Sequence, residues 1–193
     1  MTIRSGILTS LLMRAAPLMV EKVRVLINQD QIHQKIKEVA RQIERDYQGK
    51  NLVVVTVLKG AILLTADLIR EIDLPLTLET IQCSSYGAGG ARRSELKIFG
   101  LDRLDIKDKD VLIVDDIFDT GHTMAGLYKA FADLYPSSIK NCVLLKKMVP
   151  HETTIRPDYA LFEIENLFVV GYGLDYKERY RGFPSVCVVD FLE

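Results

Sequence analysis

The segment 111–124, with the sequence Val-Leu-Ile-Val-Asp-Asp-Ile-Phe-Asp-Thr-Gly-His-Thr-Met, constrains the fold of this chain more than any other part of it. Four apolar residues predict a buried strand, and the carboxylates Asp115, Asp116 and Asp119 follow it closely. Helical periodicity begins after a short loop of small and polar residues. The first N–H groups of a helix lack partners and its dipole favours an anion, so a phosphate group can bind there. Carboxylates just upstream can bind sugar hydroxyls or magnesium, which prefers oxygen ligands. The segment therefore predicts a site for a sugar phosphate.

Two other interpretations of the segment explain less of it. An Asp-rich turn before an N-capped helix accounts for one acid and leaves the other two unexplained at a strand end. A receiver-type phosphorylation domain also ends its first strand in paired acids. Such a domain would carry the pair near its start and would lack the phosphate loop, so we disfavour it.

Apolar periodicity predicts alternating strands and helices on both sides of this segment. The most regular helix is expected at 30–48, where apolar residues recur on one face and Gly49 follows. The nearly unbroken apolar run 52–58 indicates a strand buried on both faces, as in a parallel sheet. Further helices are expected at 61–72 and 123–135, and further strands at 76–83, 111–114, 139–145, 167–172 and 186–189. This order predicts one α/β domain with a doubly wound, mostly parallel sheet that binds ligands beyond its C-terminal strand ends.

Composition narrows the class of protein. The net charge is −1 over 193 residues and there is no long basic run, which argues against a nucleic-acid partner. Three cysteines lie far apart in apolar sequence, so we expect reduced core residues in a cytosolic, cytoplasmic protein. Three scattered histidines show no metal-ligand spacing. No apolar stretch reaches transmembrane length, so no membrane association is expected.

Residues 1–20 differ in composition from the rest of the chain. They contain Arg4 and Arg14 and no acid, and Arg14 interrupts what a secretory signal would need. We expect an extension that is disordered or loosely packed, or a translation start at Met19. An organelle transit peptide is the alternative. The folded domain is expected to comprise residues 21–193.

Three further features lie where ligands of an α/β sheet bind. Lys59 and Gly60 follow the strand 52–58, and Gly60 allows the backbone to approach an anion closely. Lys146 and Lys147 close the strand that follows the motif helix. In the segment 168–181, a short strand and a glycine-relieved bend lead to Asp175 and, six residues later, Arg181.

Residues 84–94 carry three glycines and two arginines without apolar periodicity, which indicates a mobile loop.

Four blocks, in this order, resemble the hypoxanthine-guanine phosphoribosyltransferases, the purine-salvage branch of the type I phosphoribosyltransferase family. They are Leu-Lys-Gly at 58–60, Ser-Ser-Tyr-Gly at 84–87, the segment 111–124, and Phe-Val-Val-Gly-Tyr-Gly-Leu-Asp-Tyr at 168–176 with a downstream arginine. The resemblance covers about residues 23–189. It implies a single-domain fold with a mostly parallel central sheet flanked by helices, a small hood and a flexible catalytic loop.

The resemblance also implies roles in catalysis and in binding the sugar phosphate. Asp119 would be the general base at purine N7. Asp115 and Asp116 would hold ribose hydroxyls or metal, and Asp175 would help to hold Mg²⁺. The 5′-phosphate of 5-phosphoribosyl 1-pyrophosphate (PRPP) would bind the loop formed by Thr120, Gly121, His122 and Thr123.

The remaining implied roles concern pyrophosphate and the purine base. Pyrophosphate would contact Lys59, Gly60 and Arg181, and the peptide bond before Lys59 can be cis in the family. Lys147 would donate to the oxygen at purine position 6, with Lys146 as a solvated spacer. The base would stack on Phe168 and pair with backbone groups of Val169. Ser85 and Tyr86 would belong to the catalytic loop, which excludes water from the site.

The expected activity follows from the resemblance. Hypoxanthine or guanine plus PRPP would give IMP or GMP plus pyrophosphate, with Mg²⁺, and the enzyme would be a homodimer or homotetramer. Two departures from the family pattern affect this expectation. Asp115 stands where relatives commonly have Glu, so its reach is shorter, and the loop 87–93 is rich in Gly and Arg where relatives have Ser and Thr.

Three alternatives stay open from the sequence. One is a xanthine-preferring relative with the same machinery. Another is a phosphoribosyltransferase fold reused as an RNA-binding regulator, which the near-neutral charge disfavours. The third is a binding module or receiver domain without transfer chemistry, which the segment around Phe168 disfavours.

Overall fold

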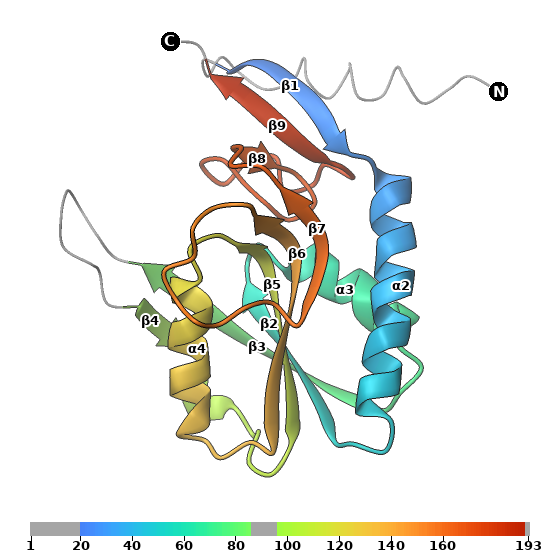
Figure 1. The fold of residues 1–193 in the computed structure, drawn as a ribbon, viewed down its shortest axis with the longest axis vertical. Coiled ribbons are helices and arrows are strands. Elements are labelled where there is room, and N and C mark those ends of the chain that lie inside the picture. The colour runs from blue at the N-terminus through green and yellow to red at the C-terminus, as the bar shows by residue number, and fades with distance from the viewer. Residues whose placement is uncertain (1–19, 86–95, 192–193) are drawn as a thin grey trace.

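A computed structural model describes residues 20–85 and 96–191, and these form an α/β domain (Figure 1). The central sheet has six strands in the order β4-β3-β2-β5-β6-β7. All neighbours are parallel except β3 and β4, which confirms the expected mostly parallel sheet. The strands are β2 (Leu52–Leu58), β3 (Leu76–Ser85), β4 (Leu96–Phe99), β5 (Asp110–Phe118), β6 (Ser138–Lys147) and β7 (Tyr159–Ile164).

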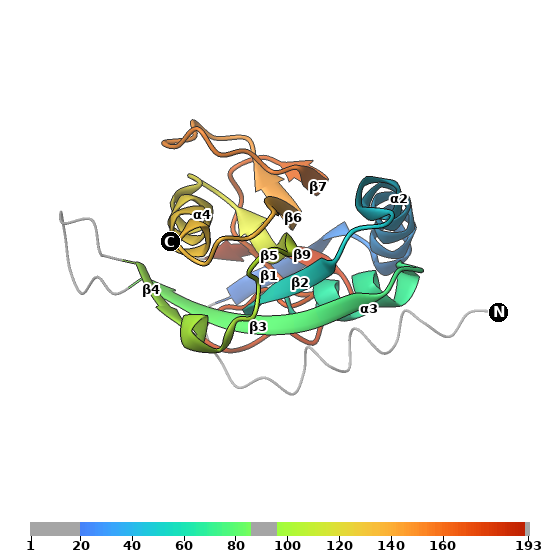
Figure 2. The same ribbon diagram turned by 90° about the horizontal axis from the view of Figure 1, so that it is seen from below.

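Helices cover both faces of this sheet. On one face, α2 (Gln29–Tyr47) and α3 (Ile62–Glu71) pack against alternate residues of β2, β5 and β6, including Leu112. On the other face, α4 (His122–Ala132) packs against the intervening residues, including Ile113 (Figure 2). Because successive residues of a strand point to opposite faces, an unbroken apolar strand fills both cores. A short 3₁₀ helix, η1 (Leu101–Arg103), follows β4.

The expected helix at 30–48 is confirmed, with its ends shifted by one residue. Asn28 caps it: Asn28 Oδ1 accepts from Gln31 N, and Gln31 Oε1 accepts from Asn28 N, each at 2.9 Å. This reciprocal pair satisfies two orphan donors of the first turn. The expected apolar face is buried throughout and consists of Ile32, Ile36, Val39, Ala40, Ile43 and Tyr47.

A second, three-stranded antiparallel sheet forms the small hood above one end of the central sheet (Figure 1). Its order is β1-β9-β8, with β1 (Val20–Ile27), β8 (Val169–Val170) and β9 (Val186–Phe191). The sheet therefore joins the N-terminal part of the described chain to its C-terminal part. The expected extension lies outside the described residues up to position 19, and Val20 already belongs to β1.

Several expected boundaries were wrong for identifiable reasons. The strand expected at 111–114 continues to Phe118, because β6 pairs with it through the carboxylates. The strand expected at 167–172 is limited to two residues, since Gly171 and Tyr172 have φ of 94° and 49°. The loop expected from position 84 begins later, because Ser84 pairs with β4. The strands β1, β4 and β7 were missed: β1 pairs only with the distant β9, and β4 and β7 are the two edge strands of the central sheet.

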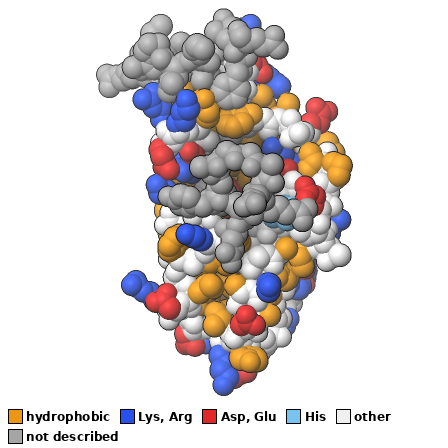
Figure 3. Space-filling model, turned by 90° about the vertical axis from the view of Figure 1, so that its left-hand side faces the viewer, with side chains coloured by type: hydrophobic (Ala, Val, Ile, Leu, Met, Phe, Trp, Pro, Cys, Tyr) orange, Lys and Arg blue, Asp and Glu red, His pale blue; other side chains and the backbone are white. Residues whose placement is uncertain are grey.

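The surface of the described residues carries charges of both signs. Figure 3 shows acidic, basic and apolar side chains interspersed over the face on the β4 and α4 side. No helix in the described ranges combines the length and the apolarity that crossing a membrane requires. The cysteines Cys83, Cys142 and Cys187 are free, and burial raises the pKa of Cys142 to about 12.

We expect Leu112→Ala to lower the free energy of unfolding by about 2–5 kcal/mol, because Leu112 is fully buried in the central strand. Denaturant titration measures this loss. The control is Leu78→Ala, since Leu78 is 46% exposed and its truncation leaves no enclosed cavity. Equal losses for the two variants would contradict the assignment of the core.

Candidate active site

The C-terminal ends of β2 and β5 and the segment after β8 meet at one cavity, here called the rim cavity. Its volume is about 280 Å³. The strand β2 ends in a cis peptide bond between Leu58 and Lys59, as the family resemblance allowed. The rim cavity is lined by Val57, Leu58, Lys59, Gly60, Cys83, Leu96, Asp115, Asp116, Ile117, Thr123, Asp175 and Arg181. Segments 115–123 and 168–181 thus share one cavity, as the sequence predicted.

A smaller cavity, here called the phosphate-loop cavity, adjoins it through shared lining residues. Its volume is about 160 Å³, and residues 117–124 and Asp115 line it. Gly121, with φ of 93°, is the N-cap of α4, and no side chain caps the helix. The first N–H groups of α4 therefore remain available to an anion, and the dipole favours negative charge there. All four residues of the expected phosphate loop line this cavity.

Two glycines allow the strand ends to approach each other closely. A Cβ atom at Gly60 would overlap the carboxylate of Asp116. A Cβ atom at Gly173 would overlap the carbonyl oxygen of Gly60, and Gly173 also has φ of 99°. A side chain at Gly60 would displace the Asp116 carboxylate, and one at Gly173 would push the segment after β8 away from the backbone of Gly60. The two glycines therefore allow the close contacts on this side of the rim cavity.

Charged side chains surround the outer part of the rim cavity. Arg181 Nη2 lies 2.7 Å from Asp175 Oδ1, and Arg181 Nη1 donates to the carbonyl oxygen of Gly173 at 2.7 Å. Lys59 Nζ lies 3.1 Å from Glu178 Oε2. Arg181 Nε is buried without a hydrogen-bond partner in the described part of the chain. An unpaired guanidinium donor beside a cavity suits an anionic ligand.

Asp115, which is buried, and Asp116, which is half-buried, form an acid pair. Asp116 N donates to Asp115 Oδ1 at 2.9 Å. Burial, and then the charge of Asp116, raise the pKa of Asp115 well above the usual carboxyl value. Burial also raises the pKa of Asp116, against the opposing effects of hydrogen bonds and Arg181. A cation entering the rim cavity would relieve this unfavourable burial of charge.

The expected metal ligands are not assembled as a preformed metal site. Asp115, Asp116 and Asp175 all line the rim cavity, but Asp175 is engaged by Arg181 and accepts from Glu178 N at 2.8 Å. Among residues 20–85 and 96–191, no group of three or more His, Cys, Asp or Glu is arranged to hold a metal ion. Carboxylate oxygens are nevertheless the donors that Mg²⁺ prefers, and Mg²⁺ commonly takes only one or two of them beside substrate phosphates and water.

Asp119 lies in the phosphate-loop cavity and is held from β6 and the loop after it. Lys147 Nζ lies 3.3 Å from Asp119 Oδ2, and His151 Nδ1 contacts the Asp119 carbonyl oxygen at 2.9 Å. Lys147 also donates to Asn166 Oδ1 at 3.2 Å. Its side chain is only 15% exposed, unlike a solvated lysine. Lys146 instead pairs with Glu163 at 2.8 Å, and its side chain is 27% exposed.

Some expected site residues lie outside both cavities. Phe168 is 44% exposed and packs edge-on against Tyr176, and Val169 is buried in the hood. Neither lines the rim cavity or the phosphate-loop cavity, and Lys147 reaches the latter only through Asp119. Ser85 ends β3, whereas Tyr86 and the loop 87–93 lie outside the described residues.

Sequence reasoning missed the loop after β6. Glu152 N donates to the Thr120 carbonyl oxygen at 3.0 Å, and the Glu152 side chain pairs with His122 at 2.8 Å. Thr153 lies against Gly121. One signal was available: this loop follows the strand beside the motif strand, so it had to leave the sheet at the same edge.

The buried acids make a prediction about stability. When an acid has a higher pKa in the folded state than in the unfolded state, the free energy of unfolding falls as pH rises from the unfolded-state pKa to the folded-state pKa. It stays lower at higher pH. Asp115→Asn removes the ionisable group. We therefore expect this variant to be more stable than the wild type at about pH 7.5, with a difference that shrinks towards about pH 4. Denaturant titrations at the two pH values measure it.

The control for this prediction has the opposite sign. Hydrogen bonds from Lys140 and Tyr159 lower the pKa of Asp46. Asp46→Asn should therefore lose stability at neutral pH, and the loss should disappear as pH falls through the lowered pKa. An Asp115→Asn variant that is less stable than the wild type at neutral pH would contradict the buried-acid assignment.

Comparison with known proteins gives a consistent result. The model of the phosphoribosyl transferase domain family matches residues 28–177. A hypoxanthine-guanine phosphoribosyltransferase from Streptococcus pneumoniae is 40% identical over 166 residues, which cover 86% of this chain and 92% of that protein. A crystal structure of a hypoxanthine phosphoribosyltransferase from Staphylococcus aureus matches with a TM-score of 0.82 and 32% identity, covering 98% of this chain and 97% of that one.

Longer relatives also contain this domain. The bifunctional protein TilS/HprT of Listeria innocua is 39% identical over 86% of this chain, but the match spans only 26% of that protein. A receiver domain is excluded, because the family model and the solved structure match most of the chain. On the strength of these matches and of the shared cavity, the chain belongs to the phosphoribosyltransferase family, within its hypoxanthine-guanine branch.

Proposed function

We propose that this protein transfers the phosphoribosyl group of PRPP to a 6-oxopurine, hypoxanthine or guanine, and releases IMP or GMP and pyrophosphate. One observation carries the proposal. Two adjoining cavities are lined by the uncapped N-terminus of α4, by the acid pair Asp115 and Asp116, and by residues 58–60 with Arg181. Together they offer two anion-binding ends with carboxylates between them, which matches a ribose carrying a phosphate at each end.

The 5′-phosphate would bind the loop from Thr120 to Thr123. Backbone N–H groups at the start of α4 would donate to its oxygens, and the helix dipole adds a favourable field. The ribose hydroxyls would then reach the carboxylates of Asp115 and Asp116.

Pyrophosphate would bind at the other end of the rim cavity. Lys59 and Arg181 would exchange their contacts with Glu178 and Asp175 for contacts with the phosphates. The buried Nε of Arg181 supports this role, because it lacks a partner in the described residues. An arginine fork binds phosphate oxygens in two directions and so orients the leaving group.

Magnesium fits the donor set of the rim cavity. Asp115, Asp116 and Asp175 would hold it together with oxygens of PRPP and water. When bound, Mg²⁺ would neutralise charge on the departing pyrophosphate. The acids themselves keep the ribose oriented and keep negative charge near the anomeric carbon, where positive charge develops.

Asp119 would accept the proton that the purine loses. In the reaction, purine N9 bonds to the anomeric carbon, the bond from that carbon to the pyrophosphate oxygen breaks, and the N7 proton moves to Asp119. Lys147, 3.3 Å from Asp119, would orient that carboxylate in the free enzyme and donate to the oxygen at position 6 of the bound base. Phe168 and Val169 would contact the base from the hood once the site closes.

Further assignments belong to the same proposal. The partners would be the purine base, PRPP and pyrophosphate, in a cytoplasmic salvage reaction, and the enzyme would act as a homodimer or homotetramer. Xanthine remains the nearest alternative substrate, because the family's discriminating contacts involve backbone groups near Asp175.

We expect Asp119→Asn to lower kcat by about 10²–10⁴-fold with little change in PRPP affinity, because the amide keeps the shape but cannot accept the proton. Steady-state kinetics and calorimetric PRPP titration separate the two effects. Asp133→Asn, an exposed site at the end of α4, is the control. An unchanged turnover number for Asp119→Asn would remove this residue from the mechanism.

An assay with PRPP and four bases tests the activity itself. We expect nucleotide formation with hypoxanthine and guanine, little with xanthine and none with adenine, whose amino group cannot accept from Lys147. Chelation of Mg²⁺ should abolish turnover, and its return should restore it. No nucleotide from any base would refute the proposed function, and xanthine as the best substrate would revise its specificity.

A further inference from the structure

The side chains of Asp67 and Tyr172 join helix α3 to the segment after β8. Tyr172 Oη donates to Asp67 Oδ2 at 2.6 Å, although the two residues are 105 positions apart in sequence. Tyr172 is 4% exposed, and burial raises the pKa of its hydroxyl, so the group stays a protonated donor. None of the roles assigned above uses this contact.

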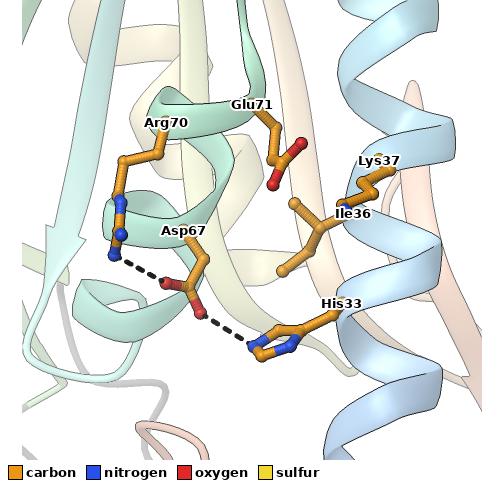
Figure 4. A pocket seen from close by; sticks show the side chains of 6 residues that line it. All are labelled: His33, Ile36, Lys37, Asp67, Arg70 and Glu71. Atoms are coloured by element: carbon orange, nitrogen blue, oxygen red, sulfur yellow. Dashed lines mark ion pairs between the residues drawn. The ribbon is translucent and has the colours of Figure 1, made fainter.

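Asp67 also lines a surface pocket between α2 and α3. Figure 4 shows its carboxylate directed towards His33 on α2 and Arg70 on α3. The distances are longer there, 3.7 Å to His33 Nε2 and 3.8 Å to Arg70 Nη1. Tyr172 therefore makes the shortest of these three contacts to Asp67. The exposed ion pairs contribute little by comparison.

Tyr172 lies in the middle of a tight turn. Gly171, Tyr172 and Gly173 all have positive φ, of 94°, 49° and 99°. Gly171 and Leu174 bond to each other in both directions, at 2.9 and 3.1 Å. A left-handed conformation is unfavourable for a non-glycine residue and persists where the surroundings hold it. The hydroxyl of Tyr172 is one such restraint, because it fixes the side chain of the strained residue.

This turn sets the position of Arg181. The Gly173 carbonyl oxygen accepts from Arg181 Nη1 at 2.7 Å, and Gly173 N donates to the Arg181 carbonyl oxygen at 2.9 Å. The same Gly173 packs without space for a side chain against the carbonyl group of Gly60. Helix α3, which carries Asp67, begins two residues after Gly60. Both halves of the expected pyrophosphate site are thus tied to α3.

We propose that Asp67 and Tyr172 are positioning residues for pyrophosphate: their hydrogen bond fixes the turn 171–174 on α3 and so sets the spacing between Arg181 and the loop 58–60. Neither residue touches the ligand. The inference rests on the proposed role of this end of the rim cavity in binding pyrophosphate. It adds the hydrogen bond that keeps Arg181 and the loop 58–60 at the required spacing.

The variant Tyr172→Phe tests the role of the hydrogen bond to Asp67, because it removes only the hydroxyl group that donates it. Tyr172→Phe should raise the KM for PRPP, and the dissociation constant of inorganic pyrophosphate, by about 10-fold, as expected for loss of a hydrogen bond to a charged group. The KM for the purine base and kcat should stay within about threefold, since the proposed base contacts Phe168 and Val169 are held by their own backbone bonds to β9. Asp67→Ala should reproduce this pattern.

A conservative variant and a double variant distinguish positioning from a general structural role. Asp67→Asn retains an oxygen that accepts from Tyr172, so its PRPP affinity should lie close to that of the wild type. The double variant Tyr172→Phe with Asp67→Ala should lose no more PRPP affinity than the single variant that loses more, because the two side chains act through one contact. His33→Ala is the matched control: it removes a neighbour of the same carboxylate and should change PRPP affinity by less than about twofold.

Several outcomes would overturn the inference. Unchanged affinities of Tyr172→Phe for PRPP and pyrophosphate would overturn it, as would equal losses of affinity for PRPP and for the purine base. A PRPP affinity of Asp67→Asn as low as that of Asp67→Ala would also overturn it. If Asp67→Ala does not fold, Tyr172→Phe carries the test alone.

Calorimetry with pyrophosphate keeps this test independent of turnover. A wild-type protein that binds pyrophosphate but forms no nucleotide would contradict the proposed activity and leave the positioning test intact. A wild-type protein that is active while Tyr172→Phe matches it would contradict the positioning role alone. A wild-type protein that does not bind pyrophosphate would overturn the inference.

Discussion

The close approach of Gly60, Asp116 and Gly173 is the constraint on which the site depends. A side chain at Gly60 would overlap Asp116, and one at Gly173 would overlap the Gly60 carbonyl. The strands β2 and β5 are already neighbours in the sheet, and the missing side chain at Gly60 leaves room for the Asp116 carboxylate beside it. The missing side chain at Gly173 lets the segment after β8 lie directly against the backbone of Gly60. Gly60, Asp116 and the neighbouring residues of that segment, Asp175 and Arg181, then line the same rim cavity.

That junction gathers more charge than a protein interior ordinarily tolerates. Asp115 is buried and Asp116 half-buried, both with raised pKa values, while Arg181 and Lys59 line the same rim cavity, each engaged by an acid. A ligand that brings anionic phosphates with a divalent cation would satisfy both sets of charges together. The free protein is therefore held in a state that is electrostatically unfavourable locally, which is common at functional sites.

The sequence predicted the central part of the fold well. Elements with strong periodicity or an unbroken apolar run, such as 30–48 and 52–58, were placed within a residue or matched the observed bounds. The missed strands β1, β4 and β7 lack such a signal, because each is defined by the partner it pairs with and not by its own pattern. The same holds for the end of β5, which lasts as long as β6 remains beside it. Pairing between distant segments is a tertiary property.

The sequence alone determined the chemistry available to this protein: the acids, the phosphate loop, the lysines and the arginine stand in an order that only a few functions require. Tertiary structure decided which of them meet. Among the residues that the structure describes, it put Asp175 against Arg181 and assembled no preformed metal site. It also held Asp119 from Lys147 and His151, and joined α3 to the turn 171–174 through Asp67 and Tyr172. The reason is physical: a residue's identity fixes which interactions it can make, whereas its partners depend on how distant backbones pack, and no local pattern in the chain records that packing.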